Sequence, residues 1–293
     1  MPDKETKNIL TRETLEKELD LEIRTDTAVE KVSTSDRTVL LKNGERIAYD
    51  RLLMQSDAVS YYATFDNWLV GTKQGEYIEE ALGLKEGKGP FNIEFITGDP
   101  GDNNINFFFD GAISVLQPYI DAGKIVVTSG QVEFDQVATP TWKTDVAQKR
   151  AEDILTANYA GGENIDVWLC SNDSTALGVT NALEANYGGE NWPIITGQDA
   201  ELMATKNIIS GHQTMSIAKD TRTLAEKCVT MVNAVLTGSE PEINDTTTYD
   251  NGVFVVPSYL CTPVAVDANN YQAVLVDTGY YTSEELANYC FTN

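Results

Sequence analysis

Polar side chains that could hold a small molecule follow five short apolar runs of this 293-residue chain. Each cluster comes after a predicted β-strand, and the clusters are Asp50-Arg51, Asp102-Asn103-Asn104, Asn172-Asp173, Asp199 and Lys219. Their carboxylate, amide and charged groups donate or accept hydrogen bonds in several directions. In open α/β sheets the ligand crevice lies at the carboxyl ends of the strands, so the pattern predicts a binding cleft for a small polar molecule.

Other reactive side chains are few and isolated. The single histidine, His212, follows Gly211 in a predicted turn and has no visible partner for acid–base chemistry. Four cysteines are widely spaced without a CxxC pair, at Cys170, Cys228, Cys261 and Cys290. We interpret them as separate thiols and leave a Cys261–Cys290 disulfide open. We expect no metal site and no cofactor.

The composition is that of an acidic globular chain. A net charge of −24 and a pI near 4.2 would repel nucleic-acid phosphates and anionic membranes. There is no run of about 18 apolar residues, and residues 1–12 lack the apolar stretch of a secretory signal, so we expect no export signal in the chain as written. Residues 1–46 carry 11 acidic and 9 basic residues, whereas residues 47–293 carry 34 and 12. This shift indicates a boundary near Arg46.

From Val59 onward, strand-length apolar runs alternate with amphipathic segments of helix length, an order typical of a parallel α/β fold. The predicted strands cover residues 59–65, 91–97, 125–128, 167–170, 194–196, 214–217 and 253–256. Predicted helices cover residues 67–82, 107–122, 144–158 and 221–236, with one after 173–174 and a short one near 203. The phenylalanines at 107–109 are expected in a helix core, where one of them could touch a ligand.

The first 46 residues show a different pattern. Residues 27–32 and 38–41 have the alternation of strands, and Lys42-Asn43-Gly44-Glu45 has the composition of a hairpin turn. We therefore expect a short antiparallel meander here and no βαβ unit.

Several longer stretches carry a family resemblance. From Ile47 to about Leu286 the chain resembles the periplasmic sugar-binding proteins of ABC importers, in the D-xylose-binding and multiple-sugar-binding branch. The stretches that carry the resemblance are Ile47-Ala48-Tyr49-Asp50-Arg51-Leu52, residues 59–67, Asp102-Asn103-Asn104, residues 115–119, Gly197-Gln198-Asp199-Ala200, Asn251-Gly252-Val253 and residues 256–260.

The resemblance implies a two-lobed type I periplasmic-binding-protein fold, with parallel sheets flanked by helices and a sugar clamped between the lobes. It also implies sugar contacts from Asp50, Arg51, Asp102, Asn104, Asn172, Asp199 and Lys219, with Trp142 lending an aromatic face. Planar polar groups can engage neighbouring sugar hydroxyls in pairs, and an indole covers the apolar side of a sugar ring. By the same resemblance we expect a monomeric, non-catalytic receptor that delivers a monosaccharide to ABC permease subunits. Its location would be periplasmic, or extracellular and membrane-anchored.

Several of these candidates have an alternative structural role. Asp173 and Ser174 fit helix caps better than ligands. Lys219 could be a solvated lysine at a strand end, Trp142 a core or lid residue, and Asp199 a helix cap. The sequence leaves these alternatives open.

The N-terminal segment also resembles a second family. Residues 29–53, with 38–45 leading into Tyr49-Asp50-Arg51-Leu52-Leu53, are similar to the meander of pyridine-nucleotide-dependent flavin reductases. About three strand–helix units of the sugar-binding family have no counterpart before residue 47, so we interpret the chain as a chimera or truncated product with an incomplete N-terminal lobe. The expected parts are a foreign segment at 1–46, an N-terminal lobe remnant at 47–68 and 216–256, and a C-terminal lobe at 69–215 and 257–293.

Two other classes of function are alternatives to a binding receptor. A cytoplasmic sugar-sensing regulatory domain would carry a helix-turn-helix at its N-terminus, which residues 1–46 do not supply. The second alternative is an enzyme. A reductase would need a loop that binds a nucleotide, but the chain has no GxGxxG motif. A glycosidase would rely on carboxylates such as Asp102 and Asp199. We expect a binding protein and no enzyme.

Overall fold

The computed structural model describes residues 29–33, 38–43, 46–48 and 59–287. The chain forms two units, Met1–Met54 and Gln55–Asn293, and each is described by itself.

The described part of the first unit is a three-stranded antiparallel sheet in the order β1-β2-β3. Its strands are β1 (Val29–Ser33), β2 (Thr38–Leu41) and β3 (Arg46–Ala48). Val39 of the central strand pairs with Val32 on one side and Ile47 on the other. The predicted meander is thus confirmed, whereas the likeness to flavin reductases stays a prediction.

A parallel sheet in the order β6-β5-β7-β8 is the centre of the second unit. Its strands are β5 (Phe91–Ile96), β6 (Ile125–Val127), β7 (Val167–Cys170) and β8 (Ile194–Ile195). All four residues of β7 are buried, because helices cover both faces of the sheet and a continuous apolar run therefore suits this strand.

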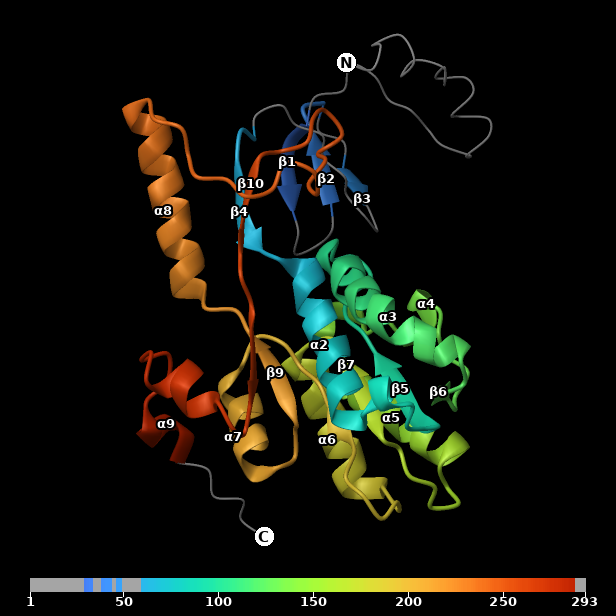
Figure 1. The fold of residues 1–293 in the computed structure, drawn as a ribbon. Helices are drawn as coiled ribbons and strands as arrows, with labels where there is room; N and C mark the ends of the chain where they lie inside the picture. The colour runs from blue at the N-terminus through green and yellow to red at the C-terminus, as the bar shows by residue number, and fades with distance from the viewer. Residues whose placement is uncertain (1–28, 34–37, 44–45, 49–58, 288–293) are drawn as a thin grey trace. The chain divides into compact units, whose positions relative to one another are not determined.

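Helices pack on the two faces of this sheet, as Figure 1 shows. The longer ones are α2 (Asn67–Leu82), α3 (Asn104–Asp121), α5 (Thr144–Asn158) and α6 (Asp173–Asn186). Alternate residues of β7 point to opposite faces: Leu169 packs in a cluster with Ile78 and Leu116 of α2 and α3, and Trp168 packs in a cluster with residues of α5 and α6. Because neighbouring side chains of a strand point to opposite faces of the sheet, β7 packs against helices on both sides.

Close approach of α2 and α3 depends on glycine. A Cβ atom at Gly71 would lie 2.0 Å from the Phe108 carbonyl oxygen, and one at Gly111 would lie 2.5 Å from that of Trp68. No side chain fits at either position, so the two glycines set the distance between the two helices.

Next to the end of β8, a separate two-stranded sheet pairs β9 (Met215–Ala218) antiparallel with β11 (Val264–Asp267). The Ile217 amide donates to the Gly197 carbonyl, and the Asp199 amide donates to the Ile217 carbonyl. The segment after β8 therefore runs parallel to β9. Shorter helical elements of this unit are η2 (Leu84–Glu86), α4 (Phe134–Val137), η3 (Pro140–Trp142), α7 (Leu202–Ser210), η4 (Gln272–Val276) and α9 (Ser283–Ala287).

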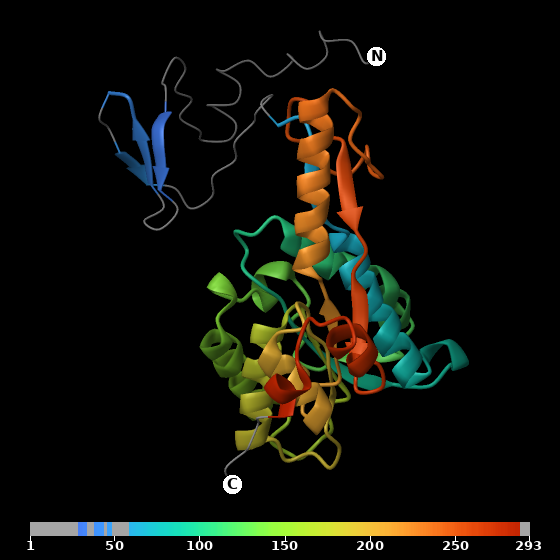
Figure 2. The same ribbon diagram turned by 90° about the vertical axis from the view of Figure 1, so that its left-hand side faces the viewer.

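A second, two-stranded parallel sheet joins β4 (Tyr62–Phe65) to β10 (Ser258–Cys261). The long helix α8 (Thr221–Thr237) lies beside this pair, as Figure 2 shows. Val229 and Leu236 on α8 are 68% and 80% exposed.

The predicted strand at 253–256 is wrong. Asn251 Oδ1 accepts from the amides of Val253 and Phe254, and Asp250 Oδ1 accepts from that of Gly252, whose φ is +81°. These local bonds satisfy the amides that a strand would use, so the segment forms a turn and the strand begins at Ser258. The other predicted elements are present with ends shifted by up to three residues.

Two further sequence expectations concern thiols and membranes. Cys170 and Cys261 are buried free cysteines and Cys228 is exposed, whereas Cys290 lies outside the described residues. Within the described ranges, no helix is both long and apolar enough to cross a membrane.

Candidate functional site

One polar cavity of about 310 Å³ lies at the carboxyl ends of the strands. Six of the eight predicted site residues line it, namely Asp102, Asn104, Trp142, Asn172, Asp199 and Lys219. The other two, Asp50 and Arg51, lie outside the described residues. The volume falls at the lower end of the range of about 300–1,000 Å³ typical of small-molecule sites.

The strand directions explain this convergence. Asp102 and Asn104 follow β5, Asn172 follows β7, Asp199 follows β8, and Lys219 follows β9. Because β5, β7, β8 and β9 run parallel, their carboxyl ends meet at one edge. Residues more than 100 positions apart in sequence are thereby brought around one cavity.

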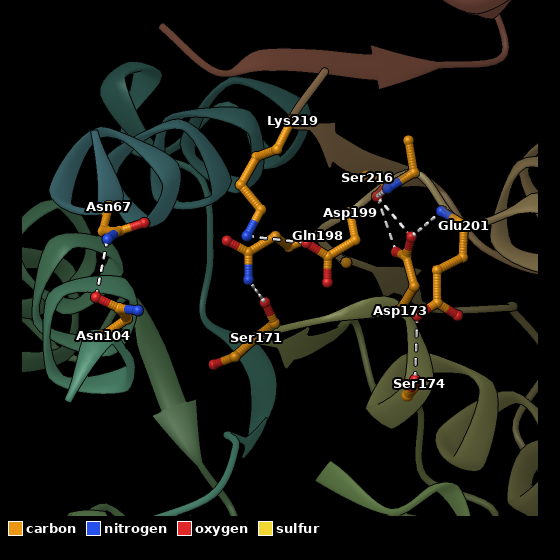
Figure 3. Close-up of polar contacts among 12 residues, drawn as sticks. Asn67, Asn104, Ser171, Asp173, Ser174, Gln198, Asp199, Glu201, Ser216 and Lys219 are labelled. Carbon is orange, nitrogen blue, oxygen red and sulfur yellow. Dashed lines mark hydrogen bonds and ion pairs between the residues drawn. The ribbon is translucent and has the colours of Figure 1, made fainter. Parts of the chain in front are cut away.

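Two amides form one wall of the cavity. Asn67 Nδ2 donates to Asn104 Oδ1 over 3.0 Å (Figure 3). The backbone amide of Asn104 donates to Asp102 Oδ1 over 2.9 Å. Asn67 is held at the start of α2, where Asp66 caps the helix by accepting from the Leu69 amide. The start of each helix thus places one amide side chain at the cavity.

Asn172 has two structural roles. Its Oδ1 accepts from the Thr175 amide over 3.0 Å, so Asn172 is the N-cap of α6, and it also lines the cavity. The prediction that Asp173 and Ser174 cap this helix is wrong, because both already belong to its first turn. Since the cap uses only Oδ1, the Asn172 amide group can still donate to a ligand.

Asp199 and Lys219 form an ion pair at the cavity. Lys219 Nζ lies 2.9 Å from Asp199 Oδ1 and 5.3 Å from the centre of the Phe108 ring. Asp199 does not cap α7, because that helix begins after Glu201. Lys219 is mostly buried, so it is not a freely solvated lysine at a strand end.

Trp142 supplies an aromatic surface. It ends the η3 turn with φ of +57°, and Thr141 before it has φ of +58°. A Cβ atom at Gly98 would lie 2.1 Å from the indole, so the ring rests directly on that glycine. Trp142 is half-buried and lines the cavity while also packing against a core cluster. Trp142 can therefore pack in the core and contact a ligand at the same time.

Four lining residues were not among the predicted contacts, and they are Thr64, Phe65, Asn67 and Gln198. Phe108, one of the three phenylalanines of which one was expected to touch a ligand, also lines the cavity. Asn67 is the first residue of α2, and Gln198 directly precedes Asp199. Their shared signal is position: each is within a few residues of a strand end or on the first turns of a helix that follows one.

The charged groups of the cavity are two carboxylates, Asp102 and Asp199, and one ammonium, Lys219. In the part of the chain that the structure describes, no group of three or more His, Cys, Asp or Glu side chains is arranged to hold a metal ion. The arrangement provides donors, acceptors and three aromatic side chains around a small volume. It is suited to a polar molecule with several hydroxyl groups.

Comparison with known proteins identifies the class of protein that this geometry represents. Residues 46–240 match the periplasmic binding protein domain. The chain belongs to this family, and its α/β architecture is the type I fold of that family.

Two individual relatives within this family are named as sugar-binding proteins. The multiple sugar-binding periplasmic receptor ChvE of Rhizobium radiobacter is 53% identical over 243 residues, which cover 82% of this chain and 68% of that protein. The D-xylose-binding periplasmic protein of Escherichia coli is 35% identical over 240 residues, covering 82% of this chain and 67% of that protein.

Two solved structures resemble the chain in fold and sequence. An ABC transporter solute binding protein from Clostridium phytofermentans with bound β-D-glucose is 60% identical, with a TM-score of 0.76 over 82% of this chain and 74% of that one. A carbohydrate transporter solute binding protein from Chloroflexus aurantiacus in complex with D-glucose is 33% identical, with a TM-score of 0.69 over 81% and 73% of the two chains.

Proposed function

We propose that this chain is the solute-binding component of a sugar ABC importer and holds a monosaccharide in the polar cavity without transforming it. The observation that carries the proposal is the convergence on one cavity of five polar side chains predicted at strand ends and of Trp142, which the family resemblance implied. Relatives with 53% and 60% identity are, by their names, a sugar receptor and a glucose-bound solute binding protein.

Each side chain has a proposed role in holding the sugar. Asn104 and Asn172 donate from amides, Asp102 and Asp199 accept from hydroxyls, and Lys219 donates from its ammonium group. Trp142 covers the apolar face of the sugar ring. Asp50 and Arg51 are proposed as further contacts on the strength of the family resemblance alone.

The contacts of the two cavity carboxylates favour binding without turnover. A glycosidase needs an acid and a second carboxylate on either side of a glycosidic bond. Asp199 is instead paired with Lys219, and Asp102 accepts the Asn104 amide, so both carboxylates are engaged in positioning. We infer a receptor whose mechanism is closure of two lobes around the ligand.

The proposed setting follows from the family. Relatives named periplasmic receptors support a periplasmic or membrane-anchored extracellular location, and a partnership with ABC permease subunits. The division into an N-terminal lobe at 47–68 and 216–256 and a C-terminal lobe at 69–215 and 257–293 is part of the same proposal. The ligand would bind where Phe65 and Asn67 meet Asp199 and Lys219.

Calorimetric titration with D-glucose, D-galactose, D-xylose and L-arabinose tests the proposal. Saturable heat with one or more of these sugars, together with no release of nitrophenol from nitrophenyl glycosides, is the expected result. Rapid hydrolysis would instead indicate a glycosidase. Absence of heat from a chain with a cooperative unfolding transition would refute sugar binding by this chain.

A further inference from the structure

Asp173 is a buried carboxylate directly behind the cavity. Only 1% of its surface is exposed, and it does not line the cavity, although its neighbour Asn172 does. Ser216 Oγ lies 2.8 and 3.0 Å from the two carboxylate oxygens, and Gln213 Nε2 donates over 2.9 Å. The Glu201 amide donates to Oδ2 over 2.8 Å (Figure 3). A single side chain thus joins α6, β9 and the segment before α7.

The segment before α7 has an unfavourable backbone. Asp199 and Ala200 have φ of +96° and +49°, in a region that residues other than glycine rarely adopt. Such a conformation persists only where surrounding contacts determine it. The turn therefore requires contacts that hold it in place.

Three consecutive amides of this turn are fixed. The Asp199 amide donates to the Ile217 carbonyl over 2.9 Å, and the Ala200 amide donates to Ser216 Oγ over 3.0 Å. The Glu201 amide donates to Asp173 itself. Asp173 thus holds one amide directly and a second through Ser216.

Asp173 also contacts the beginning of the turn. Its backbone amide donates to the Gln198 carbonyl over 3.0 Å. A Cβ atom at Gly197 would lie 2.0 Å from Asp173 Oδ1, so the carboxylate occupies the space that any side chain at that position would need. Asp173 therefore contacts the segment 197–201 at both of its ends, at Gly197-Gln198 and at Glu201.

We infer that Asp173 is the positioning residue for Asp199: it holds the left-handed turn that keeps the Asp199 carboxylate at the cavity and 2.9 Å from Lys219 Nζ. Asp173 acts on ligand affinity only through Asp199 and Lys219. The inference rests on the proposed function, since affinity is one of its two readouts.

The first test is a double-mutant cycle. Asp173→Asn keeps the size of the side chain but turns an amide group toward donors, and we expect it to weaken D-glucose binding by about tenfold. The same change in an Asp199→Asn background should weaken binding by less than about twofold, because the group it positions is already altered. Asp153→Asn, on the exposed face of α5, is the matched control and should leave affinity unchanged.

Equal weakening in both backgrounds would show that Asp173 acts independently of Asp199 and would overturn the inference. A folded Asp173→Asn variant with unchanged affinity would also overturn it. If this variant does not fold, Ser216→Ala keeps the Asp173 carboxylate but removes the hydroxyl that links it to the Ala200 amide, and it should show the same non-additivity with Asp199→Asn.

A second readout needs no sugar, so failure of the proposed function leaves it intact. Lys219 should react faster with an amine-directed reagent in the Asp173→Asn variant, because its carboxylate partner is displaced, and peptide mass spectrometry reports the rate. The peptide with Lys149, an exposed lysine on α5, should react at the same rate in both proteins. An unchanged Lys219 rate in the folded variant would contradict the positioning role.

Discussion

Lys219 Nζ lies 2.9 Å from Asp199 Oδ1, so the ends of two neighbouring segments present a paired cation and anion to one cavity. The pair keeps both side chains at the cavity wall before a ligand binds. In the proposed receptor, the ammonium group would donate to a sugar hydroxyl and the carboxylate would accept from another. A site arranged in advance loses less conformational entropy when the ligand binds.

Replacement of the cation should weaken sugar binding. We expect Lys219→Met to reduce affinity for D-glucose by about 10- to 100-fold, because a hydrogen bond from a charged group contributes roughly 1.5–3 kcal/mol. Calorimetry measures the change. Lys149→Met on exposed α5 is the control, and an equal loss of affinity in both variants would contradict a local role for Lys219.

The indole ring of Trp142 should contribute to sugar affinity. Trp142→Ala is expected to weaken sugar binding by about tenfold, because loss of an aromatic face removes both contact area and shape, whereas Trp142→Phe should retain part of the affinity. Titration followed by calorimetry gives the ranking of the three proteins. An alanine variant that binds as well as the original protein would assign Trp142 to packing alone.

Asp173 should make stability depend on pH. Burial raises the pKa of its carboxyl from 3.8 to about 8, although hydrogen bonds from the Glu201 amide, Gln213 and Ser216 lower it. Between these values the native state keeps a proton that the unfolded state has lost, so this group's contribution to the free energy of unfolding falls as pH rises from about 4 to about 8.

Urea unfolding at pH 5 and pH 8 measures this effect. The stability advantage of the original protein over Asp173→Asn should be smaller at pH 8 than at pH 5, since other titrating groups are common to both proteins. An advantage that is constant or grows with pH would contradict the raised pKa.

Contact between α2 and α3 should tolerate no side chain at Gly71. Gly71→Ala would place a methyl group against the Phe108 carbonyl, and we expect a loss of about 1–3 kcal/mol in the free energy of unfolding. Gly188→Ala is a matched control, because the nearest atom to its added Cβ is 4.0 Å away. Because α2 and α3 carry Asn67 and Asn104, sugar affinity should fall in the first variant as well.

Much of the site could be predicted because most of its residues are marked by their immediate neighbours in the sequence. Asp102, Asn172, Asp199 and Lys219 each follow an apolar run, and the parallel order of those runs brings them to one edge. Asn104 follows Asp102 by two residues and begins α3. The family resemblance added Trp142, for which no strand-end signal exists.

Tertiary contacts explain what the sequence did not predict. Aspartate is a residue type that often caps helices, but the Asp173 carboxylate accepts hydrogen bonds from Gln213 and Ser216, about 40 residues away. Asn67 contributes to the cavity only because α2 packs closely on α3. Residues 253–256 have the composition of a strand, yet bonds from neighbouring side chains form a turn there.

The most direct test of the central claim is calorimetric titration of D-glucose into the original chain and into Asp199→Asn, both verified as folded by cooperative unfolding. Saturable binding at micromolar affinity or tighter in the original chain, with clear weakening in the variant, is the result we predict. No binding by the folded original chain, or equal affinity in both proteins, would contradict a monosaccharide site in this cavity.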